Sequence, residues 1–207
     1  MVTSIAARLE AIKLVIQADM EPSGSSKRPF TRPSILFDAK EAADIDVHTI
    51  EQMTTTPIIT CDMDFVKYEE EYILNPSSIK LFTCRWLSKK TKPKALIFIC
   101  HGYAMECSIT MKNTAIRLAK AGFAVYGIDY EGHGKPAGLQ GYVNNFDDVV
   151  NDCVIYFTNI CESKENKGNM RYLMGESMGG AMALLVHGKK QDFWDGAVLV
   201  APMCKMK

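Results

Sequence analysis

The sequence predicts an α/β fold in which helices cover both faces of a mostly parallel sheet, giving three layers. From residue 94 onward, short apolar runs alternate with helical segments of about 12 to 17 residues, as in β-α-β units. Several of these runs are apolar without interruption, which is typical of strands that are buried on both faces. Turns follow them at the edge of the sheet where such folds bind their ligands.

Residues 1–66 form a predicted N-terminal extension, and residues 67–207 form the predicted sheet domain. Apolar residues at helical spacing predict a short helix near the start of the extension: Ile5, Leu9, Ile12 and Ile16. Its other faces are not strongly basic, so docking on a protein surface is favoured over docking on a membrane. Residues 21–34 contain three prolines and four serines and are typical of a linker. A second helix is expected around residues 38–53, where His48 has no partner motif.

The sheet domain is expected to begin with an antiparallel pair of strands. Residues 68–73 and 79–87 are rich in strand-forming side chains, and a turn-rich segment, residues 75–78, separates them. Residues 94–100 then predict a buried strand that runs directly into His101 and Gly102. The rest of the domain alternates between helices, at residues 110–121, 146–162 and 178–190, and strands, at residues 123–129, 171–175 and 196–201.

Composition and charge exclude several classes of function. Twenty-four lysine and arginine residues balance 24 aspartate and glutamate residues, so the chain lacks the basic excess of a nucleic-acid-binding protein. It has no apolar stretch near the roughly 18 residues of a membrane span, and no secretory signal. Its seven cysteines form no C-x-x-C pair, which favours reduced, buried thiols in the cytoplasm. Peripheral contact with a membrane and the oligomeric state stay open.

Residues 175–179 have the pattern G-x-S-x-G, with Ser177 at the centre. The pattern follows a predicted strand and opens a predicted helix, which is the setting that a nucleophile elbow requires. Such a turn strains the backbone of the serine, and Gly175 and Gly179 leave room for the helix and the strand to approach. Ser177 is therefore the predicted nucleophile of an acyl transfer. The alternative is a glycine-rich packing turn with an incidental serine.

Acyl transfer passes through a tetrahedral oxyanion, which needs two preorganised hydrogen-bond donors. One predicted donor is the backbone N–H of Met178, the residue after the nucleophile. The other is the N–H of Tyr103, in the loop after the strand at residues 94–100. His101 and Gly102 are expected to fix the shape of that loop, although His101 could also be a catalytic base.

The other histidines near the motifs are not expected to be catalytic. His133 lies between two glycines, and a hydrogen-bonding role that shapes its loop is favoured over a metal site, because no Cys, His or Asp cluster supports one. His187 is ten residues beyond Ser177 on the same predicted helix, or about 15 Å along its axis, so it cannot be the base. No metal and no cofactor are expected.

Three segments together resemble the α/β-hydrolase superfamily: HGYAMECS from residue 101, YGIDYEGHGK from residue 126, and GESMGG from residue 175. The resemblance covers residues 65–207 and is greatest to the monoacylglycerol lipase and caffeoylshikimate esterase branch, particularly plant members, grouped with the serine-aminopeptidase-like (S33) hydrolases. It implies an α/β-hydrolase sheet, Ser177 as nucleophile, and Tyr103 and Met178 as the oxyanion hole. It also implies small ester substrates: monoacylglycerols, lysophospholipids or phenolic esters.

The catalytic triad of this superfamily runs Ser, Asp, His along the chain. After Ser177 only Asp192, Asp195 and His187 remain, and both aspartates precede the strand at residues 196–201, which is the wrong place for the acid. That strand would also leave an unprotected apolar edge if it were the last one. The sequence therefore predicts a truncated product that lacks the C-terminal strands, helices and cap and hydrolyses poorly.

The sequence leaves two functions open. In its complete form the protein is expected to be a serine hydrolase of carboxylic esters that forms an acyl-enzyme on Ser177. Peptidase activity is a weaker option in the same class. The alternative is a non-catalytic hydrolase-like protein that binds a ligand or a partner, or an inactive truncated product.

Overall fold

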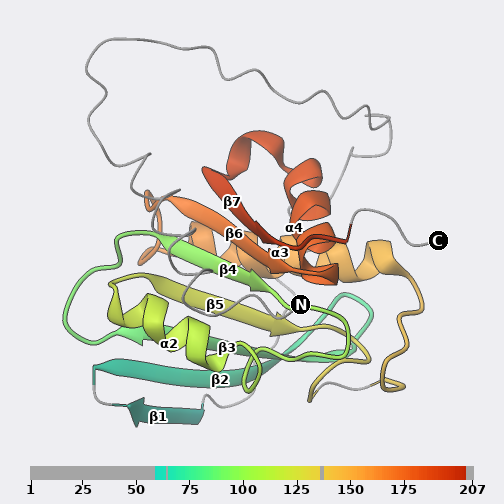
Figure 1. Cartoon of the computed structure of the whole chain (residues 1–207), viewed down its shortest axis with the longest axis horizontal. Helices are drawn as coiled ribbons and strands as arrows, with labels where there is room; N and C mark the ends of the chain where they lie inside the picture. The colour runs from blue at the N-terminus through green and yellow to red at the C-terminus, as the bar shows by residue number, and fades with distance from the viewer. Residues whose placement is uncertain (1–58, 64, 136–137, 204–207) are drawn as a thin grey trace.

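The computed structural model describes residues 59–63, 65–135 and 138–203, which contain a seven-stranded sheet in the order β1-β2-β3-β5-β4-β6-β7 (Figure 1). The first three strands are antiparallel: β1 (Ile59–Met63), β2 (Val66–Leu74) and β3 (Lys80–Ser88). β3 pairs antiparallel with β5 (Ala124–Asp129). The remaining pairs are parallel and involve β4 (Leu96–Cys100), β6 (Arg171–Glu176) and β7 (Gly196–Val200). The helices and the linker expected before residue 58, and His48, lie outside the described residues.

The chain reverses its direction of travel across the sheet at β4. It moves from β4 to β5 through α2 (Lys112–Lys120), and then back past β4 to β6 through α3 (Phe146–Glu162). Because such crossovers are right-handed, these two helices lie on opposite faces, and α4 (Met178–Lys189) joins α3 (Figure 1). Loops that leave the carboxyl ends of β4 and its neighbours therefore diverge, which opens a crevice beside β4.

β4 shows how the sequence pattern builds the two halves of the core. Its five residues are all buried, so an uninterrupted apolar run is what the position requires. Leu96, Phe98 and Cys100 belong to the cluster that includes α3 and α4, whereas Ile97 and Ile99 belong to the α2 cluster. The Phe98 ring lies 4.8 Å from the ring of Phe157 and 5.6 Å from that of Trp194. Fully burying a side chain of this kind stabilises the fold by about 1.5–3 kcal/mol.

The element bounds agree with the predicted ones at α3 and differ at α2. α3 begins where predicted, because the side chain of Asn145 accepts a hydrogen bond from the N–H of Asp147 and caps the helix. α2 begins at Lys112 rather than at residue 110. Thr110 is held in a turn instead, since its N–H donates to the carboxylate of Glu106 and its hydroxyl accepts from the Glu106 N–H.

β1 was not predicted, and it lies inside the segment that the sequence assigns to the N-terminal extension. Its register pairs Cys61 with Tyr68, so within the described part of the chain the sheet begins at Ile59. At the other end of the order, β7 pairs with β6 on one side only among the described strands. Val198 and Val200 of β7 are buried, and Ala197 is exposed.

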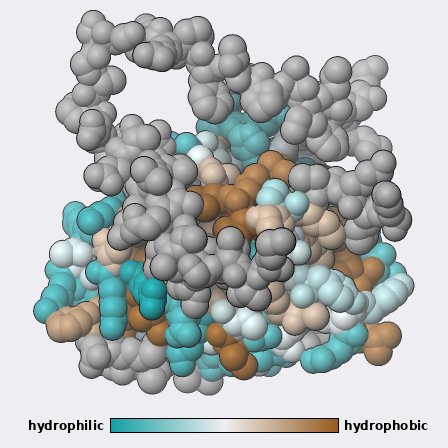
Figure 2. Space-filling view, viewed as in Figure 1, coloured by the Kyte–Doolittle hydropathy of each residue, from teal (hydrophilic) through white to brown (hydrophobic). Residues whose placement is uncertain are grey.

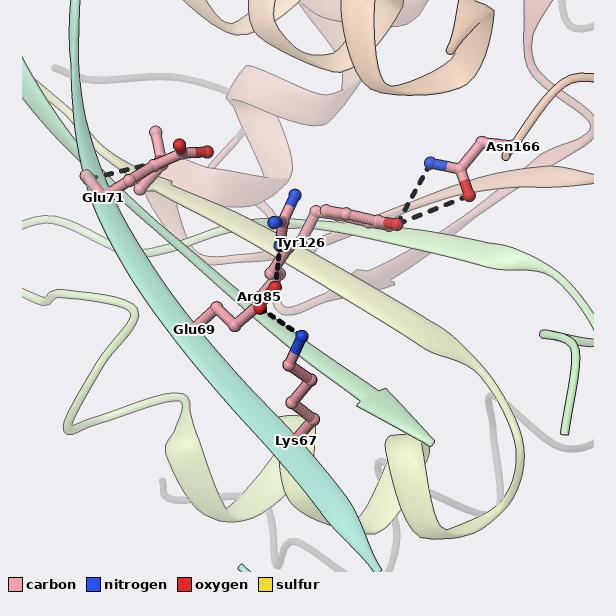
Figure 3. A network of polar contacts seen from close by, with 7 residues as sticks. Lys67, Glu69, Glu71, Arg85, Tyr126 and Asn166 are labelled. Atoms are coloured by element: carbon pink, nitrogen blue, oxygen red, sulfur yellow. Dashed lines mark hydrogen bonds and ion pairs between the residues drawn. The ribbon is translucent and has the colours of Figure 1, made fainter. Parts of the chain in front are cut away.

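A polar network crosses the outer part of the sheet (Figure 3). Glu69, buried on β2, pairs with Lys67 at 2.6 Å and with Arg85 of β3 at 2.5 Å. Burial alone would raise the pKa of Glu69, but hydrogen bonds from both cations hold it below its usual value. Further along, the Asn166 amide donates to the Tyr126 hydroxyl at 3.1 Å. These contacts satisfy the buried carboxylate of Glu69 and the hydroxyl of Tyr126.

The cysteines whose side chains are described are free and buried: Cys84, Cys100, Cys107, Cys153 and Cys161. Burial raises the pKa of each of these thiols. Among the described residues, no helix combines the length and the apolar character needed to cross a membrane.

Candidate active site

Ser177 stands at the sharp turn between β6 and α4, at the carboxyl edge of the sheet. Its φ of 55° and ψ of −119° correspond to the first central position of a type II′ turn, where glycine is the usual residue. The Ser177 N–H donates to the Val200 carbonyl at 3.0 Å, and the Ser177 carbonyl accepts from the Met203 N–H at 2.9 Å. The end of β7 therefore holds the strained turn in place, while Ser177 itself is exposed.

The two glycines of the motif lie where the strand and the helix touch. A Cβ atom at Gly175 would lie 2.1 Å from the Gly179 carbonyl oxygen, and one at Gly179 would lie 1.9 Å from the Cys100 carbonyl oxygen. Real Cβ atoms do not approach that closely, so only glycine fits at either position. This contact brings the start of α4 against the end of β4, and so places Ser177 beside the loop that follows β4.

We expect Ser177→Gly to be more stable than Ser177→Ala by roughly 1 to 2 kcal/mol, because a positive φ strains the backbone of alanine but not that of glycine. Urea unfolding of the two variants at 25 °C measures the difference. Equal stabilities would show that the turn is not strained.

The loop after β4 carries the second part of the site. A Cβ atom at Gly102 would lie 3.3 Å from the Glu176 carbonyl oxygen, so this loop runs against the residue before Ser177. The next residue, Tyr103, has a side chain that is 57% exposed and whose hydroxyl donates to the Gly141 carbonyl at 2.7 Å. Among the described residues, no acceptor takes the backbone N–H of Tyr103 or of Met178. Both donors are available to a ligand.

His101 lies fully buried beneath this loop. Its Nε2 accepts from the Tyr130 N–H at 3.4 Å, so the ring proton is on Nδ1, which donates to the Gly102 carbonyl at 2.9 Å. The ring stacks on Tyr130 with the centroids 3.9 Å apart. Burial lowers the pKa of His101 to about 3, so the ring stays neutral. With both ring nitrogens engaged, His101 orients the carbonyl that precedes Tyr103 and is not placed to accept a proton from Ser177.

His133 closes the site from the loop after β5. It is 2% exposed, and its Nδ1 lies 3.2 Å from the Glu131 carbonyl, to which it donates. Its ring meets the Tyr103 ring edge-on, with the centroids 5.3 Å apart. Its Nε2 is buried and has no partner among the described residues.

A cavity of about 440 Å³ lies between the loop before α2 and the loop before α3. Its wall includes Ala104 and Gly141, which adjoin Tyr103, and also the polar residues Glu106, Ser108, His133, Lys135 and Gln140. The buried Ser108 hydroxyl oxygen, like Nε2 of His133, has no partner among the described residues. The cavity beside the predicted oxyanion loop is therefore lined in part by polar side chains, while these two atoms are themselves buried. No group of three metal-ligating side chains occurs among the described residues.

Asp129, at the end of β5, holds the two cavity loops together and was missed by the sequence reading. One carboxylate oxygen accepts from the Cys107 N–H at 2.7 Å and the other from the Lys135 N–H at 3.5 Å. A Cβ atom at Gly134 would lie 2.2 Å from Asp129 Oδ2, so the second loop must pass directly over the carboxylate. In the sequence, the signal for this role of Asp129 was an acidic residue at the end of an apolar strand, directly before a glycine-rich loop.

Burial raises the pKa of Asp129 from 3.8 to about 6. The folded protein therefore retains this proton more strongly than the unfolded chain, and stability falls as the pH rises from about 4 to 7, by up to about 3 kcal/mol. We expect Asp129→Asn to flatten this part of the stability profile. Urea unfolding at several pH values measures the slope. An unaltered slope in Asp129→Asn would contradict the prediction.

A family model described as serine aminopeptidase, S33, matches residues 91–207, a range that holds both the oxyanion loop and the elbow. The chain belongs to this family. Two curated relatives of this S33 hydrolase are the caffeoylshikimate esterase of Arabidopsis thaliana, 28% identical, and the monoglyceride lipase of Mus musculus, 31% identical, each over 139 residues. Both alignments cover 67% of this chain but only 42% and 45% of those proteins. The S33 chain thus spans less than half the length of either relative.

Solved structures show the same fold. The acetyl xylan esterase from Paenibacillus sp. R4 superposes with a TM-score of 0.60 at 18% identity, over 72% of this S33 chain and 54% of that one. The predicted α/β-hydrolase fold is confirmed.

Proposed function

We propose that the protein is a serine hydrolase of carboxylic esters, with Ser177 as its nucleophile. The observation that carries the proposal is the exposed Ser177 in a strained turn at the carboxyl edge, beside a loop with a free backbone donor. Strain of this kind persists where the surrounding structure imposes it, as at active sites. The names of the relatives, an esterase and a lipase, support the same reaction class.

In the proposed reaction, Ser177 Oγ attacks the ester carbonyl carbon as its proton passes to a general base. The resulting oxyanion accepts hydrogen bonds from the N–H groups of Tyr103 and Met178. Collapse of this intermediate expels the alcohol, protonated by the same base, and leaves an acyl-enzyme that water then hydrolyses. Neither metal nor cofactor takes part.

We propose that the base is a histidine outside the described residues, oriented by an acid that also lies outside them. His101 uses both ring nitrogens in holding the loop. His187 is exposed near the far end of α4, about 15 Å along the helix from Ser177. We propose that His133, whose Nδ1 donates to the Glu131 carbonyl and whose Nε2 is buried, shapes the cavity wall.

The cavity beside Tyr103 favours substrates whose alcohol portion is polar. The side chains of Glu106 and Gln140 in its wall offer polar groups to a hydroxyl of the substrate. Monoacylglycerols, lysophospholipids and phenolic esters meet this requirement, and a monoglyceride lipase and a caffeoylshikimate esterase are among the relatives. The free, buried cysteines favour a reducing compartment such as the cytoplasm.

A fluorophosphonate probe tests the proposal, because it forms a covalent bond only with an activated serine. We expect mass spectrometry of the natural full-length protein to find the probe on Ser177, and not in Ser177→Ala. An unlabelled protein that still binds monoacylglycerol would favour the alternative, a non-catalytic ligand-binding protein. An unlabelled protein that binds no ester would refute both.

A further inference from the structure

The two ends of the strands differ in charge. The amino ends of β2, β4, β5, β6 and β7 lie at one edge of the sheet, because β2 and β5 both run antiparallel to β3 and the others run parallel to β5. We call this the amino edge and define it as Phe65 with residues 89–95, 120–123, 163–170 and 190–195, on the left of Figure 1. It contains eight lysines and three acidic residues.

The opposite, carboxyl edge contains the candidate active site and lacks such an excess. The described residues there include Lys80, Lys112 and Lys135 against Glu106, Glu131, Asp147 and Asp148, and Lys135 pairs with Glu70 at 2.8 Å. Because the whole chain has no net charge, the lysines of the amino edge make a local positive patch. Figure 2 shows hydrophilic residues along this side of the molecule.

Most lysines of the amino edge have exposed side chains. Seven of them are exposed: Lys89, Lys90, Lys92, Lys94, Lys120, Lys164 and Lys167. Among the described residues, no carboxylate forms an ion pair with Lys90, Lys92 or Lys94. The seven exposed lysines lie in three connections, before β4, β5 and β6, and so extend over four neighbouring strands, from β3 to β6, that are about 4.8 Å apart. A charged area of this breadth, about 15 Å, matches an extended anionic surface rather than one small anion.

Aromatic rings accompany these cations. Phe65 is 53% exposed, and Lys90 Nζ lies 4.0 Å from its ring centroid. Farther along the same edge, Arg171 lies 4.1 Å from the ring of the half-buried Phe193. Lysines that attract lipid phosphates and an aromatic side chain that enters the headgroup region are the combination that binds an anionic bilayer.

We propose that the amino edge docks on the surface of an anionic phospholipid bilayer. The lysines provide the attraction, and Phe65 provides an apolar group that a duplex of nucleic acid would not bury. Strands of five or six residues hold the two edges about 17–20 Å apart. Docking therefore leaves Ser177 facing away from the lipid. The proposal goes beyond ester hydrolysis and does not depend on it.

Vesicle co-sedimentation of the full chain tests the proposal. We expect binding to phosphatidylcholine vesicles that contain about one third phosphatidylserine, little binding to pure phosphatidylcholine, and weakening by salt, since charges are screened beyond about 8 Å at physiological ionic strength. Each lysine near such a surface contributes about fivefold in affinity, so Lys90→Glu/Lys92→Glu should bind at least about 25-fold more weakly.

The matched control is Lys80→Glu/Lys112→Glu, which reverses two exposed lysines at the carboxyl edge. Both double variants remove one cation–π contact, Lys90 with Phe65 or Lys80 with Tyr72, so they differ mainly in location. We expect the control to bind as the unaltered chain does, and circular dichroism to show that both fold. Equal losses in the two variants, equal binding to neutral vesicles, or tighter binding to double-stranded DNA than to the anionic vesicles would overturn the proposal.

Discussion

Replacement of Ser177 by alanine is expected to lower kcat for a monoacylglycerol or a phenolic ester by about 10⁴- to 10⁶-fold in the natural full-length protein. The reason is the loss of the acyl-enzyme, which divides one difficult hydrolysis into two easier steps. The oxyanion donors of Tyr103 and Met178 remain in the variant, so some residual rate enhancement persists. Steady-state kinetics give kcat, and a catalytic role in the covalent step predicts little change in substrate affinity.

A hydroxyl elsewhere in the sheet provides the control. Ser88, at the end of β3, lies at the opposite edge from Ser177, and Ser88→Ala should retain full activity. The Ser177→Gly variant should be as inactive as Ser177→Ala although we expect it to be more stable, which separates catalysis from folding. Substantial turnover in either Ser177 variant would assign the nucleophile to another residue.

Much of the fold could be predicted because burial leaves a direct trace in the sequence. The continuous apolar runs at β4 and β5 correspond to strands whose residues are all buried. The predicted bounds of α3 agree with the structure, in which Asn145 caps the first turn through a contact that is local in the sequence. These features require no knowledge of any distant part of the chain.

Features that depend on distant contacts could not be predicted in the same way. β1 alternates apolar and polar residues, but over only five positions, and it is a strand because β2 offers it an edge to pair with. The start of α2 is delayed because Thr110 hydrogen-bonds to Glu106 instead of continuing the helix. Both outcomes depend on competition between local preference and neighbouring groups.

In the candidate site too, residues with local signals could be recognised, and residues that depend on distant contacts could not. Ser177, Gly175 and Gly179 could be recognised because a close approach of strand and helix excludes every residue except glycine. The roles of Asp129 and of the His101 tautomer depend on backbone N–H groups from other loops, Cys107 and Tyr130, which spacing alone does not reveal. The residues of the strained turn were thus easier to recognise than the residues that hold the neighbouring loops.

We expect Gly179→Ala to lower the free energy of unfolding by at least about 3 kcal/mol and to remove the reactivity of Ser177. The added Cβ would lie 1.9 Å from the Cys100 carbonyl oxygen and 2.6 Å from that of His101. Both are backbone atoms at the end of β4, where the ladder pairs Cys100 with Gly175 of β6, so they cannot move aside independently. The start of α4 must shift instead, and Met178 moves with it, away from the Tyr103 loop.

Gly188→Ala is the matched control, because the same substitution in the same helix meets nothing within 4 Å. Alanine is the better helix former by about 1 kcal/mol, so this variant should be slightly more stable than the unaltered chain and equally reactive. Urea unfolding together with fluorophosphonate labelling measures both effects. If Gly179→Ala were as stable and as reactive as Gly188→Ala, the contact between α4 and β4 would not control the site. The opposite signs expected for two identical substitutions attribute the effect to the close approach beside Ser177, not to helix propensity.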